Sequence, residues 1–118
     1  MKFERGITLT EKHAALTEGV YLILISLLIP RHGYAIMQHV EKLTHGRVAL
    51  GAGTLYGAIN NLLEKRWICA VGHSVDSRKK EYTLTDLGKQ VLQIEIMRLG
   101  ELVNIGLNAL EGGMQNEN

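Results

Sequence analysis

The amino-acid sequence predicts a mainly α-helical fold with one small β-hairpin, organised as a winged helix-turn-helix followed by a long C-terminal helix. Three observations predict it. Apolar residues recur at helical spacing in three stretches before residue 65. Two short runs typical of strands then flank a polar turn and three consecutive cations. After residue 85 the helical spacing returns, and this order of elements defines the fold class.

The composition indicates one small domain with a single core. A hydrophobic content of 46% over 118 residues is too high for a disordered chain. The single cysteine, Cys69, cannot form an internal disulfide, which favours a reducing, cytoplasmic compartment. Because Cys69 lies in a predicted strand, and free cysteines are mostly small core residues, we expect its side chain to be buried.

The stretch from residue 50 to residue 67 predicts a helix with two unlike faces. Leu55, Ile59 and Leu62 recur at helical spacing and predict a face buried in the core. Glycines at the start of the helix allow another group to approach the backbone, and the free N–H groups there favour an anion. A phosphate flanked by base edges would use all these features, so we expect this helix to read DNA. The expected DNA-facing residues of this helix are Gly53, Thr54, Tyr56, Gly57, Asn60 and Asn61.

The net charge of +1 conceals an uneven distribution. Residues 30–80 contain eight Lys or Arg residues against three acidic residues, whereas residues 81–118 contain two against six. The basic segment includes the predicted reading helix. We therefore expect it to form a nucleic-acid face, and the acidic segment to form a separate appendage that does not bind DNA.

The first predicted helix begins with Thr10 as its N-cap and Glu11 in its first turn. Its second half, residues 20–29, is apolar on every side and ends at Pro30. A membrane span needs about 20 such residues, so we expect a fully buried core helix. No signal peptide is expected, because the apolar run starts late.

A turn at residues 30–33 leads into a second helix, which opens at Gly33 or Tyr34 and ends at Gly46. Together with the third helix it forms a helix-turn-helix. Its apolar side comprises Tyr34, Ile36, Met37, Val40 and Leu43, and its outward side comprises Gln38, His39, Glu41 and Lys42.

A hairpin is predicted after the third helix, with strands at residues 67–71 and 80–84 and a tip at residues 72–77. Arg78, Lys79 and Lys80 lie on its returning side. Such a charge run is by itself most often a solvated surface. Beside a helix that opens with glycines, phosphate contact is the better interpretation.

Thr85 and Asp86 cap a last helix with two apolar seams. We expect one seam to pack on the chain's own domain and the other on a second copy of the chain. This places a DNA-binding domain at residues 10–84, a dimerisation helix at residues 85–111 and a disordered tail from Gly112. The expected dimer contacts are Leu92, Ile96, Leu99, Val103 and Leu110.

Three segments resemble the PadR family of bacterial transcriptional regulators: HGYAI at 32–36, GTLYGAINNLLEKRWI at 53–68 and RKKEYTLTDLGKQVL at 78–92. The resemblance covers roughly residues 16–110. It implies a winged domain and a dimerising C-terminal helix. The implied function is binding of a homodimer to palindromic operators in double-stranded DNA, usually as a repressor that a small-molecule effector releases in some members.

The resemblance also implies roles for particular residues. It places Thr54 and Tyr56 at the DNA surface, Tyr34 near the backbone phosphates, and Arg78, Lys79 and Lys80 on the wing. Gly57 stands where many members have proline. The last helix contains no aromatic residue, so the site for flat aromatic drugs that lies between tryptophans in some short members is not expected here.

Two other classes of function were weighed. Residues 51–53, Gly-Ala-Gly, are not a dinucleotide fingerprint, because no parallel strand precedes them. His32, His39 and His45 lack metal-ligand spacing and are expected to be surface groups or helix-end partners. We therefore expect no enzyme, cofactor or metal site. The remaining alternative is a winged-helix protein-interaction module without DNA binding, which the basic wing disfavours.

Overall fold

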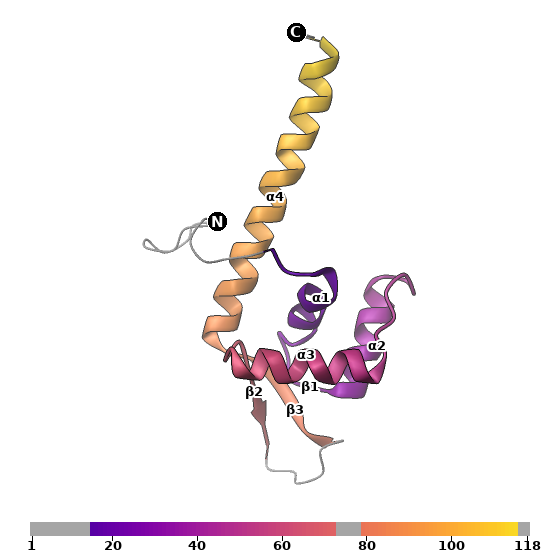
Figure 1. Cartoon of the computed structure of the whole chain (residues 1–118), viewed down its shortest axis with the longest axis vertical. Helices are drawn as coiled ribbons and strands as arrows, with labels where there is room; N and C mark the ends of the chain where they lie inside the picture. Colours follow the sequence, from indigo (N-terminus) through magenta and orange to yellow (C-terminus); the bar gives the residue numbers. More distant parts are fainter. Residues whose placement is uncertain (1–14, 73–78, 116–118) are drawn as a thin grey trace. The chain divides into compact units, whose positions relative to one another are not determined.

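A computed structural model describes residues 15–72 and 79–115 of the chain (Figure 1). The chain divides into two units, one comprising Leu16–Leu92 and the other including the residues from Gln93 onward, and each is described by itself. The structure is mostly helical with a small antiparallel sheet, as the sequence predicted. Within the described ranges, no helix is long and apolar enough to cross a membrane.

Helix α1 (Glu18–Ser26) is shorter than predicted. Thr17 caps it, because its Oγ1 accepts a hydrogen bond from the Val20 N–H at 3.1 Å. The expected start at Thr10 lies outside the described residues, but residues 15–17 are not helical. The prediction of one helix running from residue 10 was therefore wrong.

The apolar run of α1 is only partly buried. Ile23 and Leu24 are fully buried, as expected of a core helix. Leu28 and Ile29 are more than half exposed, because the helix ends at Ser26 and the chain leaves the core before Pro30. The prediction of full burial over residues 20–29 was wrong at this end.

Helices α2 (Gly33–Leu43) and α3 (Ala52–Glu64) confirm the helix-turn-helix. In α2, Ile36 and Val40 are buried, whereas Tyr34 and Leu43 are exposed despite their place on the predicted apolar side. The predicted apolar stripe was too wide, since only its central residues contact the core.

Three short antiparallel strands form the sheet, in the order β1-β3-β2. They are β1 (Arg31–His32), β2 (Ile68–Val71) and β3 (Glu81–Leu84). Strands β2 and β3 confirm the hairpin, with Ile68 opposite Leu84 and Val71 opposite Glu81. Strand β1 was not predicted, because two residues between a proline and a glycine are typical of a turn.

Cys69 corrects a second expectation about the sheet. It lies in β2, an edge strand that pairs only with β3 among the described strands, and its side chain is exposed rather than buried. Ile68, its neighbour, is buried instead. Ala70 is exposed as well, so burial does not alternate along β2, and the expected burial of Cys69 was wrong.

Helix α4 (Asp86–Gln115) begins where predicted and continues further. The Thr85 hydroxyl oxygen accepts a hydrogen bond from the Gly88 N–H at 3.0 Å, as an N-cap does. A Cβ atom at Gly88 would lie 2.9 Å from the Trp67 carbonyl carbon, so glycine allows this helix to begin directly against the backbone before β2. The helix extends to Gln115, so the prediction of disorder from Gly112 was wrong for the residues described.

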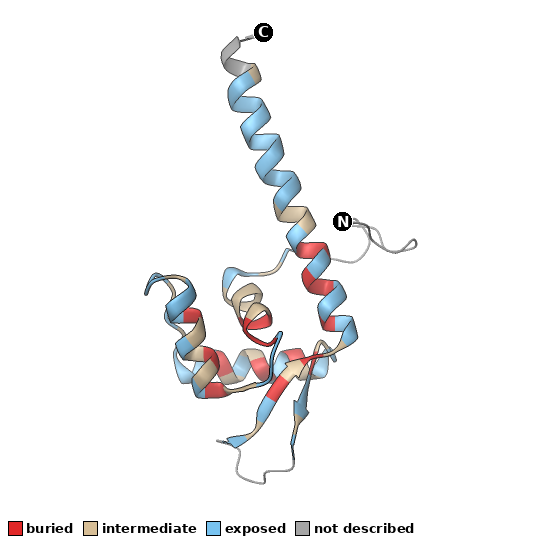
Figure 2. Ribbon diagram, turned by 180° about the vertical axis from the view of Figure 1, so that it is seen from behind, coloured by how far each residue is buried: buried red, intermediate tan, exposed pale blue. Residues whose placement is uncertain are grey.

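One hydrophobic core is shared by the helices of the first unit and by β2 and β3. Figure 2 shows buried residues on each of its helices and on β2 and β3. Because α3 contributes to the same core as α1, α2 and the hairpin, the core fixes the orientation of α3. The core residues are Ile23, Leu24, Leu27, Ile36, Val40, Leu55, Ile59, Leu62, Ile68, Tyr82, Leu84, Val91 and Leu92.

Helices α2 and α3 meet at a close contact between Gly33 and the Tyr56 ring. A Cβ atom at Gly33 would lie 2.6 Å from Cζ of Tyr56, and closer still to the phenol oxygen. Burial, and to a smaller extent Tyr56, raise the pKa of the Tyr82 phenol in β3. The Tyr56 ring therefore joins α3 to the start of α2.

Replacing Gly33 by Ala should lower the free energy of unfolding by about 1–3 kcal/mol, because the added methyl group overlaps the Tyr56 ring. Gly57→Ala in α3 is the matched control. No described atom lies within 4 Å of the added Cβ there, so alanine should raise the free energy of unfolding by about 0.5–1 kcal/mol. Urea unfolding followed by circular dichroism measures both, and equal stability of Gly33→Ala and the wild type would contradict the contact.

Candidate nucleic-acid interface

The face of α3 opposite the core is small, polar and open. Apart from the backbone of α3 itself and the adjacent residues, no described atom lies within 4 Å of the position that a Cβ atom would take at Gly53 or Gly57. Another molecule can therefore approach the helix backbone closely at both positions. Five of the six α3 residues predicted to contact DNA are exposed: Gly53, Thr54, Gly57, Asn60 and Asn61.

Tyr56, the sixth predicted contact, is placed differently. Its side chain is half-buried and packs against the core and Gly33. Tyr56 thus holds α3 against α2 instead of standing free on the outer face as Thr54 does. The spacing of residues within α3 does not predict this placement of Tyr56, because it depends on contact with Gly33 in another helix.

The N-terminus of α3 leaves backbone N–H groups open. Gly51 is the N-cap and has no side chain with which to cap the helix. The Leu55 N–H makes a hydrogen bond to the Gly51 carbonyl at 2.9 Å. The N–H groups of the three preceding residues have no carbonyl partner within the helix, and together with the helix dipole they favour an anion.

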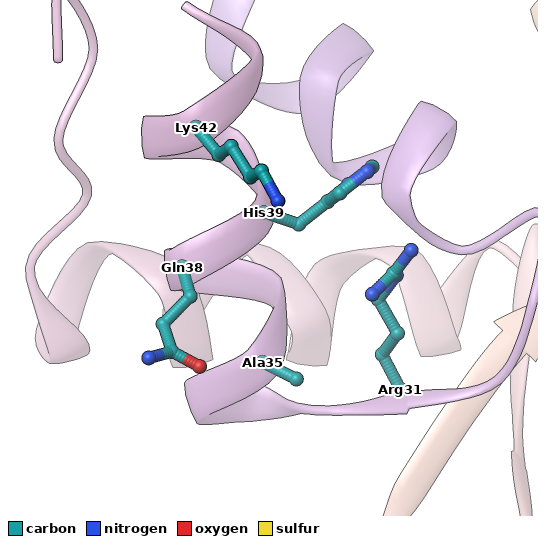
Figure 3. Close-up of a pocket in the computed structure, with 5 residues that line it drawn as sticks. All are labelled: Arg31, Ala35, Gln38, His39 and Lys42. Atoms are coloured by element: carbon teal, nitrogen blue, oxygen red, sulfur yellow. The ribbon is translucent and has the colours of Figure 1, made fainter. Parts of the chain in front are cut away.

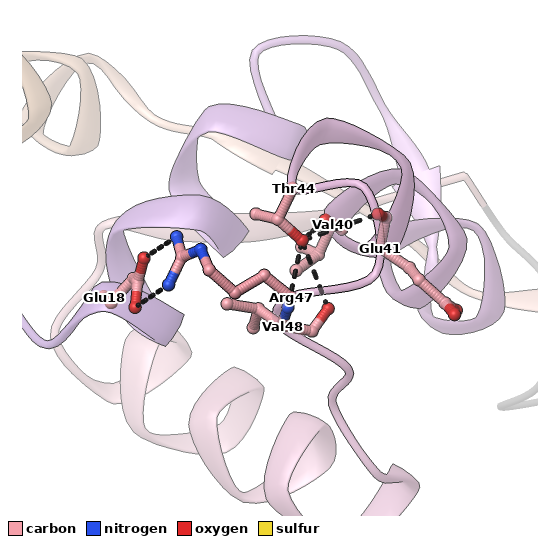
Figure 4. Close-up of polar contacts among 6 residues, drawn as sticks. All are labelled: Glu18, Val40, Glu41, Thr44, Arg47 and Val48. Atoms are coloured by element: carbon pink, nitrogen blue, oxygen red, sulfur yellow. Dashed lines mark hydrogen bonds and ion pairs between the residues drawn. The ribbon is translucent and has the colours of Figure 1, made fainter.

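Thr44 fixes the turn that leads from α2 into α3 (Figure 4). Its hydroxyl donates to the Val40 carbonyl at 3.0 Å and accepts from the Val48 N–H at 3.0 Å. His45 and Gly46 follow with left-handed φ angles of 52° and 83°, which let the chain turn away from α2. The direction of the chain is therefore set before α3 begins.

An ion pair ties the same turn to α1 (Figure 4). The Arg47 guanidinium binds both carboxylate oxygens of Glu18, with 3.2 Å between Nη1 and Oε1. The hydrogen bonds with Arg47 lower the pKa of Glu18. Both side chains are more than half exposed, so the pair contributes little to stability. It nevertheless neutralises one cation of the basic segment.

The wing is the hairpin of β2 and β3, and the structure describes both of these strands. Lys79 is exposed and Lys80 is half-buried, and both lie immediately before β3. Arg78, the third predicted wing cation, lies outside the described residues, as does the tip at 73–77. The two described lysines therefore stand at the tip end of the hairpin, where the prediction placed them.

The start of α2 presents Tyr34 to solvent. His32 is the N-cap, and its Nδ1 accepts a hydrogen bond from the Ala35 N–H at 3.3 Å, which confirms it as a helix-end partner. Tyr34 is 61% exposed. The phenol is thus accessible, and its contact with a phosphate stays a prediction.

His39 was predicted to face outward, and that prediction was wrong. Its Nδ1 lies 2.8 Å from the Oγ of Ser26, a residue only 1% exposed. Arg31 reaches the same residue, since its Nε donates to the Ser26 carbonyl at 2.8 Å. The only sign of this contact in the sequence was that His39 lies next to the buried residues of α2.

Among the described residues, no group of three or more His, Cys, Asp or Glu side chains could hold a metal ion.

The predicted dimer contacts divide between the two units. Leu92 is 3% exposed and belongs to the core of the first unit, so its prediction as a dimer contact was wrong. Val91 is buried there as well, whereas Leu87 is exposed. In the second unit Ile96, Val103 and Leu110 are exposed and Leu99 is half-buried.

Comparison with known proteins identifies the family. The sequence matches the Transcriptional regulator PadR-like family over residues 21–94, well over half of the chain. No curated protein matches it. A solved PadR family transcriptional regulator from Eggerthella lenta is 26% identical, with a TM-score of 0.59 over 84% of this chain and 82% of that chain.

Two further solved structures share the fold. A transcriptional regulator from Clostridium thermocellum is 19% identical, with a TM-score of 0.62 over 77% of this chain and 89% of that chain. RosR from H. salinarum is 23% identical, with a TM-score of 0.59 over 80% of this chain and 96% of that chain. The family comprises regulators of transcription rather than enzymes. The chain, with its winged-helix fold, belongs to the PadR-like family of transcriptional regulators.

Proposed function

We propose that the chain is a sequence-specific transcriptional regulator that binds double-stranded DNA as a homodimer. One observation carries the proposal: α3 buries Leu55, Ile59 and Leu62 and leaves its opposite, polar face open. A helix held in this way can enter a major groove without disturbing the core.

The open face carries groups suited to base edges and phosphates. Asn60 and Asn61 each offer a carboxamide with donors and an acceptor, the pattern that pairs with adenine in the major groove. Thr54 adds a hydroxyl, and Gly53 and Gly57 admit the groove edge to the helix. In this proposal the uncapped N-terminus of α3 approaches a backbone phosphate.

Cations around α3 supply the contacts that do not depend on sequence. Lys79 and Lys80, with Arg78, contact phosphates that flank the groove, and Tyr34 contacts the backbone from α2. Phosphate contacts position a reader, whereas base contacts specify its site. The wing and α3 therefore have separate roles in affinity and specificity.

The exposed surface of α4 supports dimerisation. Every residue from Glu101 to Glu111 is exposed (Figure 2), and most of them are apolar. Polar residues occupy one stripe, at positions 101, 104, 108 and 111, and leave the rest of the circumference apolar. Apolar surface of this extent marks a partner. The large exposed side chains are Leu102, Val103, Ile105, Leu107 and Leu110.

The proposed homodimer acts in the cytoplasm as a repressor on a palindromic operator. In the proposal the unit Leu16–Leu92 binds DNA, and the exposed part of α4 from Glu101 to Glu111 mediates dimerisation. Two-fold symmetry requires an inverted repeat. A small-molecule effector that changes the angle between the two α4 helices would change the spacing of the two α3 helices and release the DNA.

Replacing Lys79 and Lys80 by Ala should flatten the salt dependence of DNA binding. Each lost phosphate contact reduces the log–log slope by about 0.9, whatever the DNA sequence. Lys89→Ala is the control, because it removes one exposed cation from α4 and should leave the slope unchanged. Fluorescence anisotropy with a labelled duplex measures both. An unchanged slope in the double variant would contradict the wing assignment, and a wild type that binds no duplex would favour the protein-interaction alternative.

Replacing Val103 by Glu should convert the dimer to a monomer, because the carboxylate would be buried without a partner in the interface. Asn108→Glu is the control, since it adds the same charge on the polar stripe. Sedimentation equilibrium at micromolar concentration should give twice the 13.1 kDa chain mass for the wild type and the control. A monomeric wild type, or a dimeric Val103→Glu variant, would contradict dimerisation through this face.

A further inference from the structure

A hollow of about 420 Å³ opens beside α2. Its lining combines one residue of β1 with one side of α2 (Figure 3). Three of its side chains are basic or can become so. The lining residues are Arg31, Ala35, Gln38, His39 and Lys42.

The two permanent cations of this hollow are not neutralised. In the part of the chain that the structure describes, the terminal guanidinium nitrogens of Arg31 and the ammonium group of Lys42 have no ion-pair or hydrogen-bond partner. Glu41, the nearest acidic residue in sequence, lines a neighbouring hollow that shares Gln38 and Lys42 with the first. The lining of the first hollow contains no acidic side chain among the described residues.

The hollow is built on a buried anchor, which distinguishes it from a patch of mobile surface lysines. Ser26 donates its hydroxyl hydrogen to the Leu22 carbonyl at 2.9 Å, so its oxygen accepts from Nδ1–H of His39 at 2.8 Å. The Nε of Arg31 is bound to the carbonyl of the same residue. Arg31 and His39 are therefore held in place before any ligand arrives, which reduces the entropic cost of binding.

The electrostatics of His39 support an anionic ligand. Its pKa is lowered by burial, then by Arg31 and by Lys42, so the imidazole is neutral near pH 7. Arg31 faces it from β1 and Lys42 from its own helix (Figure 3). The Ser26 hydroxyl of α1 lies 2.8 Å from its Nδ1. An anion between the cations would offset their repulsion and raise this pKa.

We propose that this hollow is an oxyanion site, in which Arg31 and Lys42 bind a phosphate group. The phosphate belongs either to a small phosphorylated ligand or to the backbone of bound DNA. The site stands on its own contacts and does not depend on base recognition by α3.

The test titrates inorganic phosphate into the full-length chain at pH 7 and constant ionic strength, and follows it by NMR. We expect saturable shifts confined to the lining residues. Lys42→Gln should weaken phosphate binding by about tenfold, because one charge-assisted interaction is lost. Lys89→Gln removes the same charge from α4 and should bind like the wild type. Unsaturable shifts spread over all basic residues, or equal binding by Lys42→Gln and the wild type, would overturn the site.

A second measurement separates a loss of anion binding from a structural effect of the substitutions. The pKa of His39, measured from its imidazole resonances, should rise in the presence of inorganic sulfate, whose charge is constant over this pH range. The same shift should be reduced in Lys42→Gln and retained in Lys89→Gln. An unchanged His39 pKa at saturating sulfate would contradict anion binding in this hollow.

DNA binding separates the two sources of the phosphate. If the backbone occupies the site, Lys42→Gln should also reduce the salt slope of duplex binding by about 0.9. If a small ligand occupies it, the slope should be unchanged while phosphate binding weakens. Failure of the wild type to bind any duplex would refute the proposed function and leave the phosphate titration to decide this site.

Discussion

The burial of one face of α3 is the constraint on which the rest of the structure depends. Leu55, Ile59 and Leu62 are almost fully buried in a core shared by three other helices and the hairpin. In a helix with 3.6 residues per turn, fixing these positions also fixes which residues face outward. The exposure of Thr54 and Asn60 therefore follows from packing, and no specific polar contact is needed to aim them.

Contacts around α3 refine what the core determines. Thr44 and the pair of Arg47 with Glu18 define the turn before the helix, and Tyr56 locks its second turn against Gly33. Because Arg47 and Glu18 are both more than half exposed, the main effect of their ion pair is on position rather than on stability. A reading helix needs this, because a misplacement of about 1 Å already removes bidentate hydrogen bonds to base edges.

Local patterns in the sequence predicted the elements that depend on neighbours along the chain. The stripe of α3, the hairpin strands and the Thr85 cap were all apparent, because each is set within a few residues. Contacts between distant residues were not apparent. The hydrogen bond of His39 with Ser26, the burial of Leu92 and the pairing of Arg31 in β1 each depend on where other elements pack. The exposure of Cys69 has the same origin, since which residues of an edge strand are covered depends on the elements that pack against the sheet.

The central claim is that two copies of α3 are presented together to one duplex. Footprinting of the full-length chain on DNA upstream of its own coding sequence tests this most directly. The account predicts two protected half-sites related by inverted symmetry, with centres about 10 base pairs or a multiple of that apart. A single unpaired protected site, or no protection at concentrations where the chain is dimeric, would contradict it.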